Sequence, residues 1–194
     1  SHAFSGCANL QEVEFVNGLK YVASSAFAGC VSLPTLNMEE VDSIGASAFS
    51  RCRTFNVENM NKVRHIGNNA FNTCDFLKGS NGVVSLPLCD SIGAGAFLGC
   101  SNIEKIELSE NLRFLGKQAF MNCASLTSVN LSSSLQALFE ETFSGCTALK
   151  EVSYSDNLLK VHRNTFNNTP WDENLPVEGG VKYMGNIAMY VVDT

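Results

Sequence analysis

The sequence predicts a repeat solenoid, in which short repeats of 22–26 residues stack into a continuous parallel β-sheet with short helical or 3₁₀ turns, followed by a C-terminal β-hairpin. Two observations predict this fold. The first is the near-constant spacing of eight phenylalanines, which are Phe4, Phe27, Phe49, Phe71, Phe97, Phe120, Phe143 and Phe166. The second is a cysteine three residues after each of the first seven, with Thr169 in that place after the eighth. These cysteines are Cys7, Cys30, Cys52, Cys74, Cys100, Cys123 and Cys146.

A short β-strand is expected in the first half of each repeat. In the repeat that begins at Cys123, Val129 and Leu131 alternate with polar residues, and this period of two is typical of a strand. Equivalent strands of successive repeats would lie about 4.8 Å apart in one long parallel sheet. The other apolar positions of this repeat are Leu126, Leu135, Leu138 and Phe143.

The second half of each repeat, such as residues 116–122, is too short for a full helix and predicts a single helical or 3₁₀ turn. Glycine or asparagine precedes the cysteine position in most repeats, and these residues close helical turns in the left-handed conformation. Arg51 and Thr73 depart from this pattern, which indicates turns that are either strained or different. A second glycine column, Gly45, Gly67, Gly93 and Gly116, also admits Phe139 and His162, so we interpret it as a spacing preference.

Two repeats depart from the common pattern. The third places Glu58 at an inward position, where an unpaired carboxylate is costly, so we predict a bulge that turns Val57 inward instead. The fourth contains four additional residues, Lys78–Asn81, which are turn formers and predict an exposed loop.

The chain divides into a solenoid over residues 1–169 and a C-terminal cap or β-hairpin segment over residues 170–194. In this segment, alternating residues 181–184 and 187–192 flank Gly185-Asn186, a pair that favours a two-residue hairpin turn. The only tryptophan, Trp171, is expected to cover the last rung. Because the chain opens on the tail end of a repeat, we expect a fragment of a longer protein whose targeting segment lies outside it.

The repeat resembles a known family. Units of the form Cys-x-x-Leu-x-x-Val-x-Leu, followed by Ile-Gly-x-x-Ala-Phe-x-Gly-Cys, are similar to BspA-type leucine-rich repeats, also called Treponema pallidum-type repeats, over residues 1–169. The C-terminal hairpin resembles the segment that interrupts or caps such arrays. The resemblance implies a large bacterial or protozoan protein on the cell surface or secreted, associated with adhesion to host proteins and other microbes. It implies no shared catalytic residues and no cofactor.

Composition argues against several classes of partner. The formal net charge is -6, only 16% of residues are charged, and no Lys/Arg stripe is present, which argues against nucleic-acid binding. No apolar run approaches the length of a membrane helix, so we expect no membrane insertion. The sequence has no Cys-x-x-Cys, and its three histidines stand at non-equivalent positions, so we expect no metal site.

The cysteines form the most conspicuous chemical feature of the sequence. Stacked rungs would place equivalent Cα atoms within disulfide range, but their Cβ vectors would point in parallel. Free cysteine is among the most buried residue types, so we predict a ladder of buried thiols in preference to one or more bridges. Cys89 stands at a separate position, which Val41 and Val63 hold in other repeats, and is expected in the core.

The outward residues of the predicted sheet are the candidate partner-binding face. They are the residues between the two inward positions of each strand, namely Glu14, Asn37, Asn59, Ser85, Glu107, Asn130 and Ser153. A plain solvated sheet face would have the same appearance.

The favoured function is an adhesion-type interaction module that binds a protein or glycoprotein of a host or microbial surface. The alternative is a structural spacer of a larger surface protein with no ligand of its own. An enzyme is not expected, because no catalytic constellation supports it. A binder should carry clustered aromatic or charged anchors on one face, whereas a spacer should carry a polar face without them.

Overall fold

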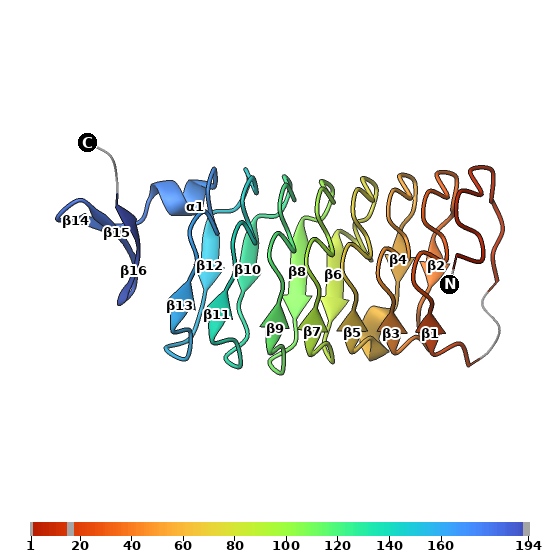
Figure 1. The fold of residues 1–194 in the computed structure, drawn as a ribbon, viewed down its shortest axis with the longest axis horizontal. Coiled ribbons are helices and arrows are strands. Elements are labelled where there is room, and N and C mark those ends of the chain that lie inside the picture. The colour runs from red at the N-terminus through yellow and green to blue at the C-terminus, as the bar shows by residue number, and fades with distance from the viewer. Residues whose placement is uncertain (1, 15–17, 192–194) are drawn as a thin grey trace.

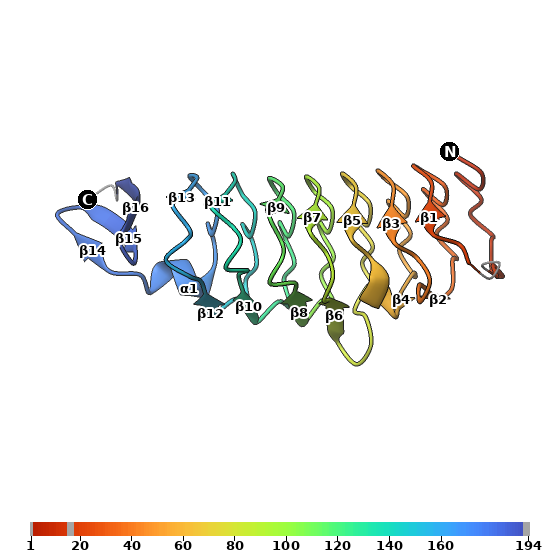
Figure 2. The same cartoon turned by 90° about the horizontal axis from the view of Figure 1, so that it is seen from below.

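The computed structural model describes residues 2–14 and 18–191, which form an elongated solenoid with its rungs stacked along the length (Figure 1). Each full rung carries two short strands, and both rows of strands are parallel (Figure 2). One row consists of the even-numbered strands from β2 to β12, and we call its solvent-facing side the even-strand face. The other row consists of the odd-numbered strands from β1 to β13, and we call its solvent-facing side the odd-strand face. The predicted solenoid of stacked parallel strands is confirmed.

The even-numbered strands occupy the positions that the sequence predicts. They pair in two groups, β2 with β4, and β6 with β8, β10 and β12 in that order. Their bounds are β2 Leu36–Asn37, β4 Val57–Glu58, β6 Val83–Leu86, β8 Lys105–Leu108, β10 Ser128–Asn130 and β12 Glu151–Ser153.

The odd-numbered strands were not predicted. They form a second row in which β1, β3, β5, β7 and β9 pair in order and β11 pairs with β13. The prediction of one continuous sheet is therefore corrected to two rows of strands, and within residues 2–14 and 18–191 each row is interrupted once. The bounds are β1 Tyr21–Val22, β3 Ser43–Ile44, β5 His65–Ile66, β7 Ser91–Ile92, β9 Phe114–Leu115, β11 Ala137–Leu138 and β13 Lys160–Val161.

The phenylalanine-containing turns carry hydrogen bonds in two directions. Within a turn, Cys52 N donates to Phe49 O at 3.1 Å, the i→i−3 bond of a 3₁₀ turn. Between rungs, Phe49 N donates to Ala70 O at 2.8 Å, so the inter-rung pairing continues around the turn. Arg51 (φ 63°) and Thr73 (φ 54°) adopt the left-handed conformation that glycine holds elsewhere, and Thr73 is strained because its side chain is β-branched.

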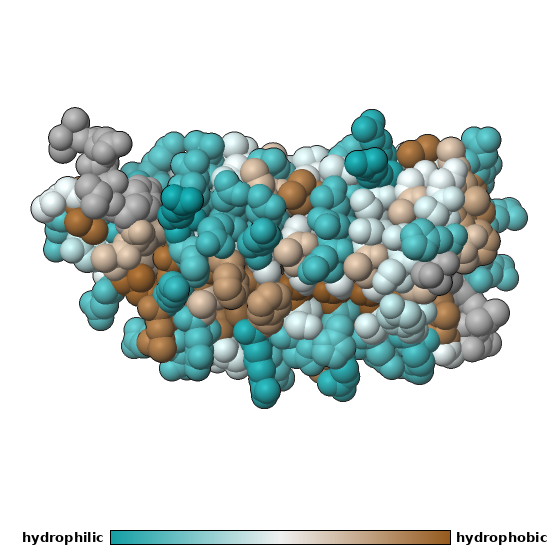
Figure 3. Space-filling model, in the orientation of Figure 1, coloured by the Kyte–Doolittle hydropathy of each residue, from teal (hydrophilic) through white to brown (hydrophobic). Residues whose placement is uncertain are grey.

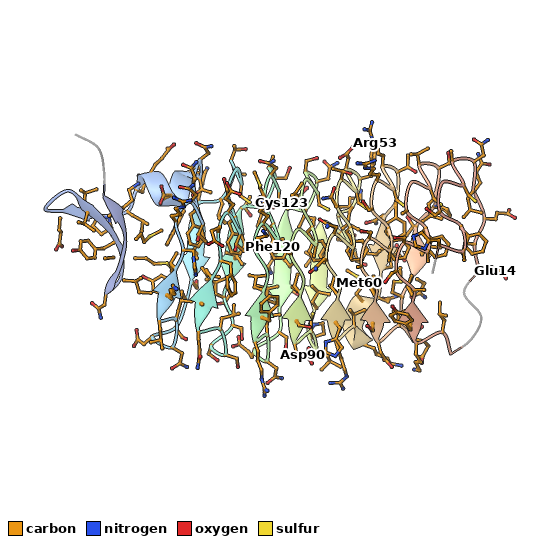
Figure 4. The ribbon with its side chains drawn as sticks, in the orientation of Figure 1. Glu14, Arg53, Met60, Asp90, Phe120 and Cys123 are labelled. Atoms are coloured by element: carbon orange, nitrogen blue, oxygen red, sulfur yellow. The ribbon has the colours of Figure 1, made fainter. Side chains whose placement is uncertain are left out.

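The interior contains a continuous stack of phenylalanine rings. Neighbouring rings from Phe27 to Phe166 lie 5.1–5.5 Å apart and nearly parallel. The six rings from Phe49 onward are almost fully buried, whereas Phe4 in the first rung is 42% exposed. Figure 4 places Phe120 inside the coil. The predicted core role of this column is confirmed.

The cysteine column lies beside the rings and makes a repeated hydrogen bond. Each buried thiol donates to the carbonyl of the preceding rung's phenylalanine, for example Cys74 Sγ to Phe49 O at 3.0 Å. That same carbonyl already accepts the amide of Cys52, so the thiol uses its second lone pair. The equivalent Sγ···O distances along the column span 2.9–3.2 Å. The predicted burial is confirmed for six column cysteines and for Cys89, but Cys7 is exposed.

The structure shows how the two irregular repeats fit into the solenoid. Val57 pairs with Leu36 and is buried, and Glu58 pairs with exposed Asn37, so the predicted bulge is confirmed. The inserted loop is exposed at Lys78, Ser80 and Asn81. The start of the loop is anchored to the preceding rung, because Asn56 Oδ1 accepts hydrogen bonds from the backbone amides of Lys78 and Gly79 at 3.0 and 2.9 Å. The even-strand row breaks beside this loop, between β4 and β6, where a 3₁₀ turn η1 spans Met60–Lys62.

The C-terminal segment caps the last rung. Thr169 accepts the amide of Asp172 and so caps helix α1, Pro170–Glu173, and the Trp171 ring lies 4.6 Å from the ring of Phe166. The predicted cover and the hairpin of β15 and β16 are confirmed, and a third antiparallel strand, β14, precedes them. Val192 lies outside the described residues. The bounds are β14 Val177–Glu178, β15 Val181–Met184 and β16 Ile187–Val191.

Helices are few in residues 2–14 and 18–191, where α1 and η1 are the only helical segments. Neither is long and apolar enough to cross a membrane.

The first prediction concerns the ring column. Phe120→Ala should lower the free energy of unfolding by about 3–5 kcal/mol, because it opens a cavity between two stacked rings. Chemical denaturation measures this loss, and Phe76→Ala, at a ring that is 61% exposed, is the matched control. Equal stability of the two variants would show that the column does not hold the rungs together.

The second prediction concerns the thiols. Burial raises the pKa of Cys52, Cys89 and Cys146 to about 12, so these groups stay protonated and unreactive at neutral pH. Thiol labelling of the native protein should therefore modify only Cys7 rapidly, and labelling after denaturation without reductant should count eight thiols. A count of six or fewer would reveal a disulfide.

The third prediction concerns the inserted loop. Asn56→Ala should cost about 1–3 kcal/mol, because the half-buried loop base loses its partners. Deletion of Lys78–Asn81 should lower the free energy of unfolding by a similar amount, because the Asn56 side chain then loses the same bonds. Denaturant midpoints measure both, with the exposed Asn61→Ala as control. Parent-like stability of Asn56→Ala would refute the anchoring role.

Candidate functional site

The structure places most of the predicted binding residues on the even-strand face. Asn37 is exposed on β2, while Ser85, Glu107, Asn130 and Ser153 follow one another across β6, β8, β10 and β12. Glu14 is exposed in the first rung, outside any strand, and lies at the end of the solenoid in Figure 4.

One predicted residue is displaced. The bulge puts Glu58 opposite Asn37 in the outward register, so Asn59 is one residue beyond the strand. Asn59 adopts a left-handed conformation before η1, and its amide donates to Asn37 Oδ1 at 3.0 Å. The outward position of the third rung is therefore Glu58 and not Asn59.

Polar side chains on the even-strand face bind one another. Lys105 Nζ lies 3.1 Å from Glu107 Oε1, and this contact, with a further hydrogen bond from Ser85, lowers the pKa of the Glu107 carboxyl. The charge of Glu107 is thus partly compensated within the protein. None of the outward residues of β2–β12 is aromatic. This face is polar, and several of its side chains form hydrogen bonds with one another, as expected of a solvated sheet.

The odd-strand face has a different character, which the sequence analysis missed. The outward residue of each strand comes from one column, and its members alternate between large and small. They are Tyr21, Ser43, His65, Ser91, Phe114, Ala137 and Lys160. The large members are exposed and the small ones half-buried, so the column forms ridges separated by hollows.

The exposed apolar side chains of this face gather around Phe114. The Phe114 ring is 46% exposed and lies 5.6 Å from the ring of Phe139. The Phe139 ring stacks on that of His162 at 5.5 Å. Leu159, one residue before β13, is 71% exposed. In Figure 3, brown apolar atoms form a broken band along the lower half of the solenoid, between teal polar side chains.

The odd-strand row breaks beside Phe139, which stands in a column that glycine fills in four other rungs. A Cβ built on Gly45 would lie 2.5 Å from Ser24 N of the preceding rung, and one on Gly93 would lie 2.6 Å from Asn68 N. Such contacts are too short for a real side chain, so glycine permits the close approach of rungs. Phe139 occupies the same position, and the pairing fails between β9 and β11, immediately before it. His162 also occupies this position, and β11 still pairs with β13, so close rung approach favours glycine here without requiring it.

Two shallow hollows flank the Phe114 ring. One has Ala137 at its floor and is walled by Phe114, Phe139 and Leu159. The other lies over Ser91 and is walled by His65, Leu88 and Phe114. Arg113 lines both, and other polar residues complete the rims, among them Gln136, Asp156, Asn157, Arg64 and Asp90.

Charged residues precede the odd-numbered strands in alternating sign, in the order Lys20, Asp42, Arg64, Asp90 and Arg113. Asp90 Oδ1 lies 2.8 Å from His65 Nδ1, and Ser91 Oγ lies 2.9 Å from the same nitrogen. A hydroxyl-activating triad needs the carboxylate and the hydroxyl on opposite ring nitrogens, so this cluster does not form one. Figure 4 shows Asp90 at the lower edge of the solenoid.

The column cysteines are poor candidates for a catalytic nucleophile, and the described residues offer no cluster of metal ligands. Burial raises the pKa of the column thiols from Cys30 to Cys146, which keeps them from forming thiolates at neutral pH. In the part of the chain that the structure describes, no three His, Cys, Asp or Glu side chains are grouped to hold a metal ion.

Comparison with known proteins agrees with this architecture. The model of the BspA type leucine-rich repeat region matches residues 1–81 and 81–191, in six copies. No curated protein matches the chain significantly. Both solved structures described next are leucine-rich repeat proteins, and both share the fold.

The leucine-rich repeat protein of T. pallidum is 30% identical, with a TM-score of 0.70, over 80% of this chain and 73% of that one. A leucine-rich repeat protein from Bacteroides ovatus is 26% identical, with a TM-score of 0.71, over 84% of this chain. The match covers only 42% of the Bacteroides ovatus protein, so this chain spans less than half of that protein's length.

Proposed function

Because this chain belongs to the BspA type leucine-rich repeat family, we propose that it is an interaction module of a cell-surface or secreted protein. The module binds a macromolecular partner, a protein or glycoprotein of a host or microbial surface, through a face built by its repeats. This is an adhesion-type role that needs no catalytic residue and no cofactor.

The observation that carries the proposal is the aromatic and charged cluster around Phe114 on the odd-strand face. Aromatic and arginine side chains supply most of the binding energy in protein interfaces, and here Phe114, Phe139 and Arg113 are neighbours. The solenoid holds them in place, because β9 pairs with β7, β11 pairs with β13, and stacked rings form the core behind both strands. Ordering these groups on binding therefore costs little conformational entropy.

The even-strand face is a second candidate surface. Glu14, Asn37, Ser85, Glu107, Asn130 and Ser153 present a polar stripe, with Glu58 in the place where the sequence suggested Asn59. Its internal hydrogen bonds and lack of aromatic residues also favour the alternative function, a structural spacer without a ligand of its own. The two functions differ in whether either face recognises a partner.

The fourth prediction tests the two faces against each other. Purified mucosal matrix proteins and microbial surface glycoproteins are immobilised, and binding of the parent chain is compared with that of Phe114→Ser and Glu107→Lys. At least one partner should bind the parent, and Phe114→Ser should weaken it about tenfold or more, because it removes a central anchor. Glu107→Lys should bind like the parent, because its face is not used.

Loss of binding with Glu107→Lys, and not with Phe114→Ser, would move the site to the even-strand face. Absence of any partner for the parent would favour the spacer. Thermal unfolding of both variants, each changed at an exposed position, checks that the fold is intact.

A further inference from the structure

The odd-strand face has a periodicity of its own, twice that of the rungs. Large outward side chains stand at β5 and β9, namely His65 and Phe114, and the small residues Ser91 and Ala137 stand at β7 and β11. The strands β9 and β11 do not pair, but their rungs stay hydrogen-bonded through the turns, where Gln118 N donates to Glu140 O at 3.0 Å and Phe120 N donates to Thr142 O at 2.8 Å. At about 4.8 Å per rung, equivalent hollows recur roughly every 9.6 Å along the solenoid. The hollows over Ser91 and Ala137 are two consecutive members of this series.

This spacing discriminates among extended ligands. A polyproline II helix rises roughly 3.1 Å per residue with three residues per turn, so every third side chain returns to the same side after about 9.3 Å. In an extended β-strand, the side chains on one side are about 6.6–6.8 Å apart. This distance matches neither the spacing of one rung, about 4.8 Å, nor that of two rungs, about 9.6 Å. Among these chain conformations, polyproline II matches the series of hollows.

The chemistry of the surface points the same way. Both edges of β5 and of β7 already pair with neighbouring rungs, so a bound chain cannot join them as an added strand. It must be held by side chains. The Phe114 ring, 46% exposed between the hollows, is an apolar surface of the kind on which proline rings pack well. A polyproline II backbone has no internal hydrogen bonds, so its carbonyls remain free for donors such as Arg113 and Gln136 at the rim.

We propose that the odd-strand face binds a proline-rich segment in the polyproline II conformation, which runs along the solenoid and places prolines three residues apart in the hollows on either side of Phe114. Arg113 lines both hollows and makes no ion pair within residues 2–14 and 18–191, so it favours an acidic residue of the ligand beside the prolines. This inference rests on the proposed function and specifies the chemistry of its partner.

The test uses a fluorescent twelve-residue peptide with proline at every third position and one glutamate, titrated with the parent chain. The comparison ligands are a shuffled peptide of the same composition, without prolines three apart, and a β-1,4-linked hexamer of N-acetylglucosamine. Fluorescence anisotropy measures the peptides, and competition measures the sugar. The periodic peptide should bind at least about tenfold more tightly than the shuffled one, the difference expected when only one hollow is filled.

Two substitutions localise the binding. Phe114→Ser removes the ridge, and Ala137→Lys fills the floor of one hollow, so each should weaken the periodic peptide about tenfold. Phe76→Ser, at an exposed ring away from both hollows, is the matched control and should bind like the parent. Thermal unfolding checks each variant.

Equal binding of the two peptides, parent-like binding by both odd-face variants, or binding of the sugar hexamer alone would each overturn the proposal. If an immobilised surface protein binds through Phe114 while the periodic peptide does not, the polyproline assignment fails and the proposed function stands. If the peptide binds through Phe114 while no surface protein does, the ligand chemistry stands and the adhesion role fails.

Discussion

The structure depends on the short distance between successive rungs, which is imposed by backbone hydrogen bonds that run from rung to rung through both strand rows and the turns. At a spacing of about 4.8 Å, equivalent side chains must form straight columns. Rings stack in one column, and each thiol reaches the carbonyl of the preceding rung in another. At Gly45, Gly67, Gly93 and Gly116, an added Cβ would meet the backbone of the preceding rung. Each repeat therefore carries the same few residues because one distance constrains them all.

The same constraint shapes the surface that is available for recognition. Because outward residues also form columns, the two faces are linear patterns and not rounded patches. The columns are interrupted in one region of the odd-strand face, where Phe139 stands in the glycine column and the odd-strand row breaks beside it. The break coincides with the hollow over Ala137 and with the exposed ring of Phe114. The surface that we propose for binding thus lies where the repeat is irregular, while the regular even-strand face stays polar.

The sequence predicts those parts of the fold whose residue pattern is repeated many times or extends over several residues. The phenylalanine and cysteine columns recur eight and seven times, and the Val129–Leu131 alternation identifies the even-numbered strands. The odd-numbered strands are two residues long, so each offers a single outward–inward pair, such as His65-Ile66, which cannot establish a period of two. The outward position of the third rung was predicted to be Asn59, because Asn59 was counted by its distance from the cysteine, whereas the bulge shifts the register so that Glu58 stands opposite Asn37.

The sequence by itself determined the solenoid, its core columns, the bulge at Val57 and the C-terminal hairpin, because these depend on residue type and spacing within one repeat or one turn. Only the tertiary structure decided the second strand row, the anchoring of the inserted loop by Asn56, and the ridges and hollows beside Phe114. Each of these arises from contacts between residues about one or two repeats apart. The physical reason is that register between rungs is set by backbone pairing, and a side chain's neighbours across that pairing are not its neighbours in sequence.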